Sequence, residues 1–101
     1  MGQKGYFVIK AQTDPEIWTR FDHWYATVHM PDAARRMKAA SAFRLHDREE
    51  LRTHVAVYVF DDMKWLETQE FQSAMQSLII EFNAAWPQGV RRQRMFYDVQ
   101  P

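Results

Sequence analysis

Cysteine is absent from this chain of 101 residues, which excludes disulfides, thiolate metal sites and a cysteine nucleophile. The sequence also lacks a signal-peptide pattern and any apolar stretch near the roughly 20 residues that a membrane-spanning helix needs. The formal net charge is +0, so no overall field attracts nucleic acid or an anionic membrane. We therefore expect a cytoplasmic protein whose partners are neutral small molecules or other protein subunits.

Large apolar side chains are abundant. Hydrophobic residues make up 47% of the chain and aromatic residues 15%, which is too much for a disordered protein. A chain of this length has room for one hydrophobic core. We expect a single globular domain over residues 1–101.

Hydrophobic periodicity predicts four strands and two main helical regions. Period-two and β-branched segments predict strands at Tyr6–Lys10, Ala42–Asp47, Thr53–Phe60 and Arg91–Val99. A helix is expected to start with Pro15 at its first position, and Pro31 then interrupts it before a second helical piece or a kinked continuation at 32–40. Asp61 and Asp62 are expected to cap a helix that runs to Trp86.

The element order β-α-β-β-α-β predicts an α+β ferredoxin-like fold, a four-stranded antiparallel sheet with the helices on one face. The other face of the sheet is not polar, because both alternating sets of Thr53–Phe60 are apolar. Either Val55, Val57 and Val59 or Ala56, Tyr58 and Phe60 point outward. We expect a second copy of the chain to cover this face, which predicts a homodimer through the sheet faces.

The aromatic first helix, which ends in His29-Met30-Pro31, and the order of the elements resemble the dimeric α/β-barrel superfamily, and the first helix is similar to that of its EthD-like branch. The resemblance covers nearly the whole chain and implies a dimeric α/β barrel. It does not fix a reaction, because the superfamily includes monooxygenases, isomerases, cyclases, lyases, haem enzymes and proteins with no assigned activity.

Two departures from these relatives narrow the choice of activity. Haem-binding relatives place a histidine on or near the second helix, whereas no histidine follows His54 here. Cofactor-independent quinone-forming monooxygenases use an Asn, Trp and Arg set, which Asn83, Trp65 and Arg44 match only loosely. We expect no cofactor.

The segment FDHWYATVHMPD of the first helix carries the main candidate site. At about 100° per residue its apolar face is centred on Phe21, Tyr25 and Val28, with His29 at the margin. His29 can therefore either exchange protons in a pocket or cap carbonyls at the helix end. His23 points away, and Asp22 is two turns from His29, too far to orient its ring.

The predicted hairpin holds two more histidines. Alternation places Arg44 with His46 and His54 with Tyr58, but the register that would bring these two faces together is open. They form a polar group on the sheet if the faces coincide, and otherwise lie in solvent near the charged turn. No spacing typical of a zinc site is present, so we expect no metal.

The last strand contributes Arg92 and Arg94 on one face and Arg91 on the other. These arginines either pair with acids or bind a carboxylate or phosphate on a substrate. Tyr97 shares the face of Met95 and Val99, and its hydroxyl is expected to enter the cavity under the first helix or to bond to the protein.

We expect a small cofactor-independent enzyme that acts on a flat, mostly apolar molecule, such as an aromatic or polyketide-like ring, by isomerisation, cyclisation, dehydration or elimination. His29 would transfer the proton, and Tyr25 and Tyr97 would bind an oxygen that becomes negative. The expected substrate contacts are Phe21, Trp24, Val28, Arg44, His46, His54 and Tyr58. The alternatives are a non-catalytic ligand-binding or accessory dimer of the EthD-like type and a cofactor-free monooxygenase.

Overall fold

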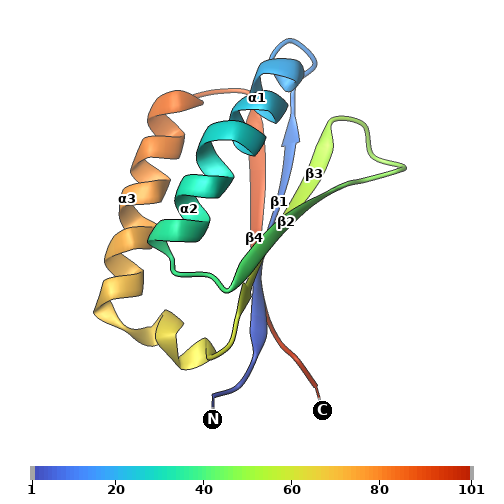
Figure 1. Ribbon diagram of the computed structural model, residues 1–101. Coiled ribbons are helices and arrows are strands. Elements are labelled where there is room, and N and C mark those ends of the chain that lie inside the picture. Colours follow the sequence, from blue (N-terminus) through green and yellow to red (C-terminus); the bar gives the residue numbers. More distant parts are fainter. Residues whose placement is uncertain (1, 101) are drawn as a thin grey trace.

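The computed structural model describes residues 2–100 and has the predicted ferredoxin-like architecture, with the helices on one face of a twisted sheet (Figure 1). The sheet is antiparallel with strand order β2-β3-β1-β4. The strands are β1 (Gly5–Thr13), β2 (Ser41–His46), β3 (Thr53–Phe60) and β4 (Val90–Asp98). The helical elements are α1 (Trp18–Trp24), η1 (Tyr25–His29), α2 (Met30–Arg36), η2 (Met63–Glu67) and α3 (Gln69–Ala85).

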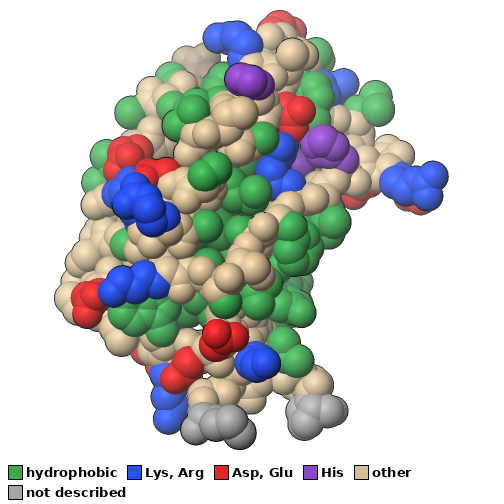
Figure 2. Space-filling model, in the orientation of Figure 1, with side chains coloured by type: hydrophobic (Ala, Val, Ile, Leu, Met, Phe, Trp, Pro, Cys, Tyr) green, Lys and Arg blue, Asp and Glu red, His purple; other side chains and the backbone are tan. Residues whose placement is uncertain are grey.

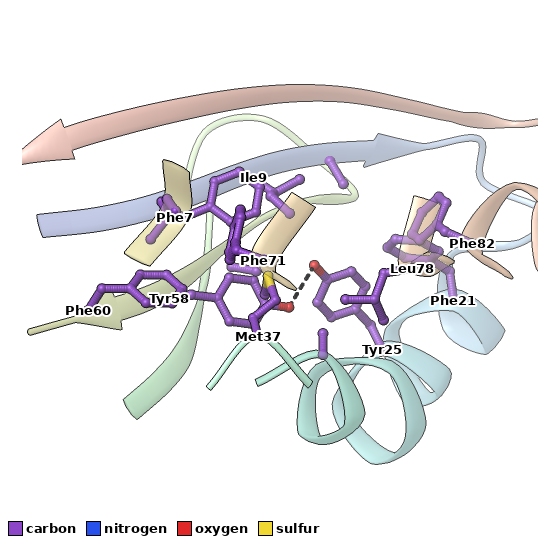
Figure 3. Close-up of a cluster of buried hydrophobic side chains, with 14 residues drawn as sticks. Phe7, Ile9, Phe21, Tyr25, Met37, Tyr58, Phe60, Phe71, Leu78 and Phe82 are labelled. Carbon is purple, nitrogen blue, oxygen red and sulfur yellow. Dashed lines mark hydrogen bonds between the residues drawn. The ribbon is translucent and has the colours of Figure 1, made fainter. Parts of the chain in front are cut away.

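The sheet faces are fixed by strand alternation. Phe7, Ile9 and Ala11 of β1 are buried against the helices, and their partners on β3 are Tyr58, Ala56 and His54. The outward set on β3 is therefore Val55, Val57 and Val59, which resolves the alternative that the sequence leaves open. The core lies between this inner face and the helices (Figure 3).

The open face of the sheet is apolar and has no cover within residues 2–100. Besides the three valines, several large side chains on it are 38–52% exposed, namely Tyr6, Phe43, Leu45 and Tyr97. Tyr6, Phe43, Leu45 and Tyr97 therefore form an apolar surface that the described chain leaves open to solvent.

The first helical region is one uninterrupted helical segment with a π-helical turn inside it, rather than two separate helices. Pro15 lies in a turn, so α1 begins three residues later than predicted, at Trp18. At the junction with α2 the backbone widens into the π-helical turn η1, where the amide of Met30 donates to the carbonyl of Tyr25. Pro31 follows directly and cannot donate to the carbonyl four residues before it. The kinked continuation is thus the correct alternative, and it ends at Arg36.

The second helical region is divided, unlike the single helix predicted from Asp62. The Asp62 carboxylate accepts a hydrogen bond from the Lys64 amide and caps only the short 3-10 helix η2. The Thr68 hydroxyl then accepts from the Phe71 amide and starts α3. Both residue types are favoured helix caps, and the nearer cap determines where each helix begins.

Candidate functional site

His29 is turned into the protein by the π-helical turn. In a regular α-helix Val28 would continue the face of Phe21 and Tyr25, whereas the extra residue in η1 brings His29 to that face instead. The His29 side chain is accordingly 8% exposed, and Val28 is 55% exposed. Val28 therefore points away from the cavity, contrary to its expected contact with a substrate, and His29, which the sequence leaves at the margin of the apolar face, points inward.

The His29 imidazole is enclosed by aromatic rings. It stacks on Trp24 with ring centroids 4.8 Å apart and meets Tyr25 edge-on at 4.8 Å and Phe82 at 5.4 Å. Burial lowers the pKa of His29 to about 4, and the positive charge of Arg92 adds to this effect. The ring is therefore neutral at pH 7, and within residues 2–100 its nitrogens have no hydrogen-bond partner in the protein.

A small cavity lies beside His29, between α2, α3 and the sheet. Its volume of about 20 Å³ is room for about one water molecule, so no aromatic ring fits it without side-chain movement. The wall is mostly apolar, with the polar groups of His29, Tyr58, Arg92 and Arg94 facing the same space. The remaining lining residues are Phe7, Ile9, Ala33, Met37, Met75, Leu78 and Ile79.

The hydroxyls of Tyr25 and Tyr58 approach each other to 3.5 Å beneath this cavity (Figure 3). Burial raises the pKa of both phenols, and for Tyr58 the neighbouring Tyr25 raises it further, so both remain protonated at neutral pH. When Tyr25 donates to Tyr58, the hydrogen of Tyr58 is available to an acceptor in the cavity.

A polar network joins α1 to the β2–β3 hairpin. Arg44 donates from Nη2 to the Asp22 carboxylate and from Nε to Nδ1 of His54 at 3.1 Å, and His46 Nε2 lies 3.0 Å from Asp22 Oδ1. Figure 2 shows basic, acidic and histidine side chains side by side in this region. The faces of Arg44, His46 and His54 therefore do coincide, and Asp22 orients this group rather than His29.

Burial within this network differs from residue to residue. The His46 side chain is 57% exposed, whereas His54 is fully buried and its Nε2 has no partner among the described residues. Burial lowers the pKa of His54 to about 3, and the charge of Arg44 contributes to this. Burial raises the pKa of Asp22, but the hydrogen bonds of Arg44 and His46 outweigh that effect and lower it. The network fixes α1 against the sheet, and none of its members lines the cavity.

Other predicted site residues lie elsewhere. Phe21 is fully buried in the core, where its ring meets His54 and Trp86, and it does not reach the cavity. Tyr97 pairs with Tyr6 on the open face of the sheet, and its hydroxyl donates to the Met95 sulfur at 3.3 Å. The expectation that Tyr97 enters the cavity under the first helix is wrong, because alternation along β4 turns it to the opposite face.

Arg92 and Arg94 were not predicted to line the cavity, although the sequence offers them as ligands of a substrate carboxylate or phosphate. Both lie on the inner face of β4, opposite Ala11 and Ile9, and both line the cavity. The sequence indicates that Arg92 and Arg94 share one face of their strand. Which of the two strand faces meets the helices depends on the β1–β4 register. Arg92 also lies over the Phe82 ring, with its guanidinium carbon 3.6 Å from the centroid.

Within residues 2–100, no three side chains of the His, Asp and Glu types are placed to hold a metal ion together. No helix in the same range is both long and apolar enough to cross a membrane.

Comparisons with known proteins agree with the fold. No family model matches the chain, and no curated protein does either. Among solved structures, a variant of SnoaB, a cofactor-independent oxygenase from Streptomyces nogalater, is similar with a TM-score of 0.61 and 14% identity, over 99% of this chain and 96% of that one. An ethyl tert-butyl ether D (EthD) family protein from Bacillus halodurans is similar with a TM-score of 0.58 and 16% identity, over 91% of this chain and 95% of that one.

An antibiotic biosynthesis monooxygenase is similar with a TM-score of 0.56 and 17% identity, over 96% of this chain and 99% of that one. Sequence identities this low carry the fold and leave the reaction open. The chain thus shares the ferredoxin-like α+β fold of these solved structures, as its element order predicts.

Proposed function

We propose that this protein is a small cofactor-independent enzyme that transfers a proton next to an oxygen of a flat, mostly apolar molecule, with His29 as the base. One observation carries the proposal. His29 is a buried, neutral imidazole that faces a cavity and has no hydrogen-bond partner within residues 2–100. A neutral imidazole can accept a proton, and a side chain held in that state inside a cavity is a functional-site candidate.

The proposed reaction moves one proton from the substrate to His29 and back. His29 takes a proton from a carbon beside a substrate carbonyl, and the electron pair of that bond moves onto the carbonyl oxygen. Tyr58 donates a hydrogen bond to this oxygen while Tyr25 donates to Tyr58. The imidazolium then returns the proton to another atom of the substrate, which gives isomerisation, or to a leaving hydroxyl, which gives dehydration.

Binding requires the cavity to widen. A flat ring needs far more room than about 20 Å³, and the side chains of Met37 and Met75 lie in the cavity wall on α2's end and on α3. Methionine has three rotatable bonds and re-packs readily. We infer that a ring enters by displacing these two side chains, with the aromatic rings around His29 excluding water.

The proposal includes a homodimer through the open sheet face. Exposed Phe43 and Leu45 on β2 and Tyr6 and Tyr97 on β1 and β4 give that face the apolar character of an interface. A second copy supplies a surface of the same chemistry, which suits a two-fold symmetric interface.

A cofactor-free oxygenase is the second candidate, because the solved structures that resemble this chain include a cofactor-independent oxygenase and an antibiotic biosynthesis monooxygenase. Its first step would be the same proton removal, from a phenol, followed by reaction of the electron-rich ring with O2 to give a quinone and water. The Asn, Trp and Arg set does not support it. Trp65 donates to the Met37 carbonyl, Arg44 binds Asp22, and Asn83 accepts from Arg92, so the three have separate partners.

Proton transfer can be tested without the natural substrate. β-Tetralone is a flat bicyclic ketone with acidic C–H bonds, and NMR in D2O follows the exchange of these hydrogens. We expect the wild type to accelerate exchange and His29→Gln to reduce that acceleration by about 10² or more. His23→Gln, an exposed change on the same helix, should keep it.

The exchange experiment and a separate O2-uptake assay distinguish the two alternatives. Wild-type exchange no faster than buffer, or equal exchange by His29→Gln, would overturn the proton-transfer function and favour a non-catalytic binding protein. Consumption of O2 with an electron-rich dihydroxynaphthalene, lost in His29→Gln, would favour the oxygenase.

A further inference from the structure

Arg92 and Arg94 place two positive charges on the cavity that the protein does not neutralise. They are two residues apart on β4, about 7 Å along the strand, and both side chains turn to the inner face. No salt bridge among residues 2–100 includes either of them, and the only protein acceptor of Arg92 is the Asn83 amide oxygen at 3.5 Å. Burial lowers the pKa of Arg92 to about 10, with a smaller contribution from the neighbouring positive charge of Arg94.

Several other arginines of the chain are paired with carboxylates, whereas Arg20, Arg48 and Arg52 form no salt bridge among residues 2–100 either. Arg36 binds Asp32 and Glu81, Arg44 binds Asp22, and Arg91 binds Asp14 at 2.9 Å. Arg91 directly precedes Arg92 in the sequence but points to the opposite face of the strand. The carboxylates near the cavity are already engaged, because Asp32 and Glu81 both bind Arg36.

The surface between these two guanidiniums and His29 is apolar and partly aromatic. Arg92 lies over the ring of Phe82, and Phe7 in the cavity wall stacks on Phe96 with centroids 4.7 Å apart and planes 7° apart. Phe96 is on the same face of β4 as Arg94 and is 54% exposed. This combination suits a flat ring with an anionic substituent, since guanidinium binds carboxylate with two parallel hydrogen bonds.

We propose that the substrate is an aromatic carboxylic acid, whose carboxylate is bound by Arg92 and Arg94 while the rest of the ring extends toward His29. The location of the reacting atoms rests on the proposed function, but the carboxylate site does not. Binding alone tests it, so a failure of catalysis and a failure of this site are distinguishable.

Calorimetric titration with 3-hydroxy-2-naphthoate and with its neutral amide tests the site. We expect the acid to bind the wild type at least about tenfold more tightly than the amide, because a guanidinium forms stronger hydrogen bonds with a carboxylate than with a neutral amide. Arg92→Gln and Arg94→Gln should each weaken the acid about tenfold and leave the amide unchanged. Arg92→Lys, which keeps the charge and loses the planar fork, should give an intermediate loss.

Arg91→Gln is the matched control, since its side chain is on the other face and its salt bridge is exposed. It should bind the acid as the wild type does, and a circular dichroism melt of every variant checks folding. Equal binding of acid and amide, no binding of the acid, an equal loss in Arg91→Gln, or displacement of the acid by inorganic phosphate at similar concentration would each overturn the proposal. His29→Gln should still bind the acid even though it loses proton transfer.

Discussion

At the scale of single residues, the main feature is a pair of histidines that the fold keeps neutral. His29 and His54 are both buried among aromatic rings, and burial lowers their pKa values to about 4 and about 3. In the unfolded chain both would titrate near 6.5. Below that pH the unfolded state binds more protons than the folded state, so folding becomes less favourable as the pH falls.

We therefore expect the free energy of unfolding to fall between about pH 6.5 and pH 4, by about 1.4 kcal/mol per pH unit for each of these histidines. Urea unfolding at a series of pH values measures this. His29→Gln should remove about half of the slope in that window, and the exposed His23→Gln should leave it unchanged. A wild-type stability that stays constant down to pH 4 would show that His29 is not buried as described.

At the scale of elements, one inserted residue decides which side chain faces the cavity. Periodicity with a constant 3.6-residue turn places Val28 inward and His29 at the margin, whereas the π-helical turn exchanges them. A π-helical turn depends on the packing of α1 and α2 against the sheet and on Pro31, which no local pattern of apolar residues reveals.

Val28→Gln tests this element. Because Val28 is exposed, we expect the substitution to change the free energy of unfolding by less than about 0.5 kcal/mol. Phe21→Ala, a buried residue of the same helical face, should cost about 3–5 kcal/mol and shows the scale of a core change. Chemical denaturation of both variants provides the comparison, and a Val28→Gln effect above about 2 kcal/mol would contradict the π-helical register.

Strand elements were easier to predict than helix ends. The Thr53–Phe60 strand has the predicted bounds because its run of β-branched and aromatic residues is uninterrupted. The predicted bounds of the two helical regions were less accurate, because Pro15 and Asp62 are strong local signals whose effect extends over only one turn. For the site, His29 and Tyr58 were predicted as cavity residues from one helix and one strand. Arg92 and Arg94 were offered as ligands of a substrate anion but not as cavity residues, since their place depends on the pairing between the first and last strands.

At the scale of the whole molecule, the uncovered apolar face is the feature that a single chain leaves incomplete. Leu45 lies on this face and is 52% exposed. In the proposed homodimer it would be covered by the second copy. A lysine there would bring a charge into the interface, and an unpaired buried charge is strongly unfavourable.

Leu45→Lys is therefore expected to shift the protein from dimer to monomer while its circular dichroism spectrum stays that of the wild type. Sedimentation velocity over a range of concentrations measures the assembly state. Ile80→Lys adds the same charge at a site on α3 that is 66% exposed, within the helical layer, and should leave the dimer intact. A monomeric wild type at all concentrations would rule out the proposed assembly.

The two methionines in the cavity wall also bear on how the protein would evolve. The Met37 and Met75 side chains are unbranched and can adopt many rotamers. The cavity beside His29 would therefore accommodate ligands of several shapes. Selection for a single compound would then require little more than replacing either thioether with a stiff, branched side chain.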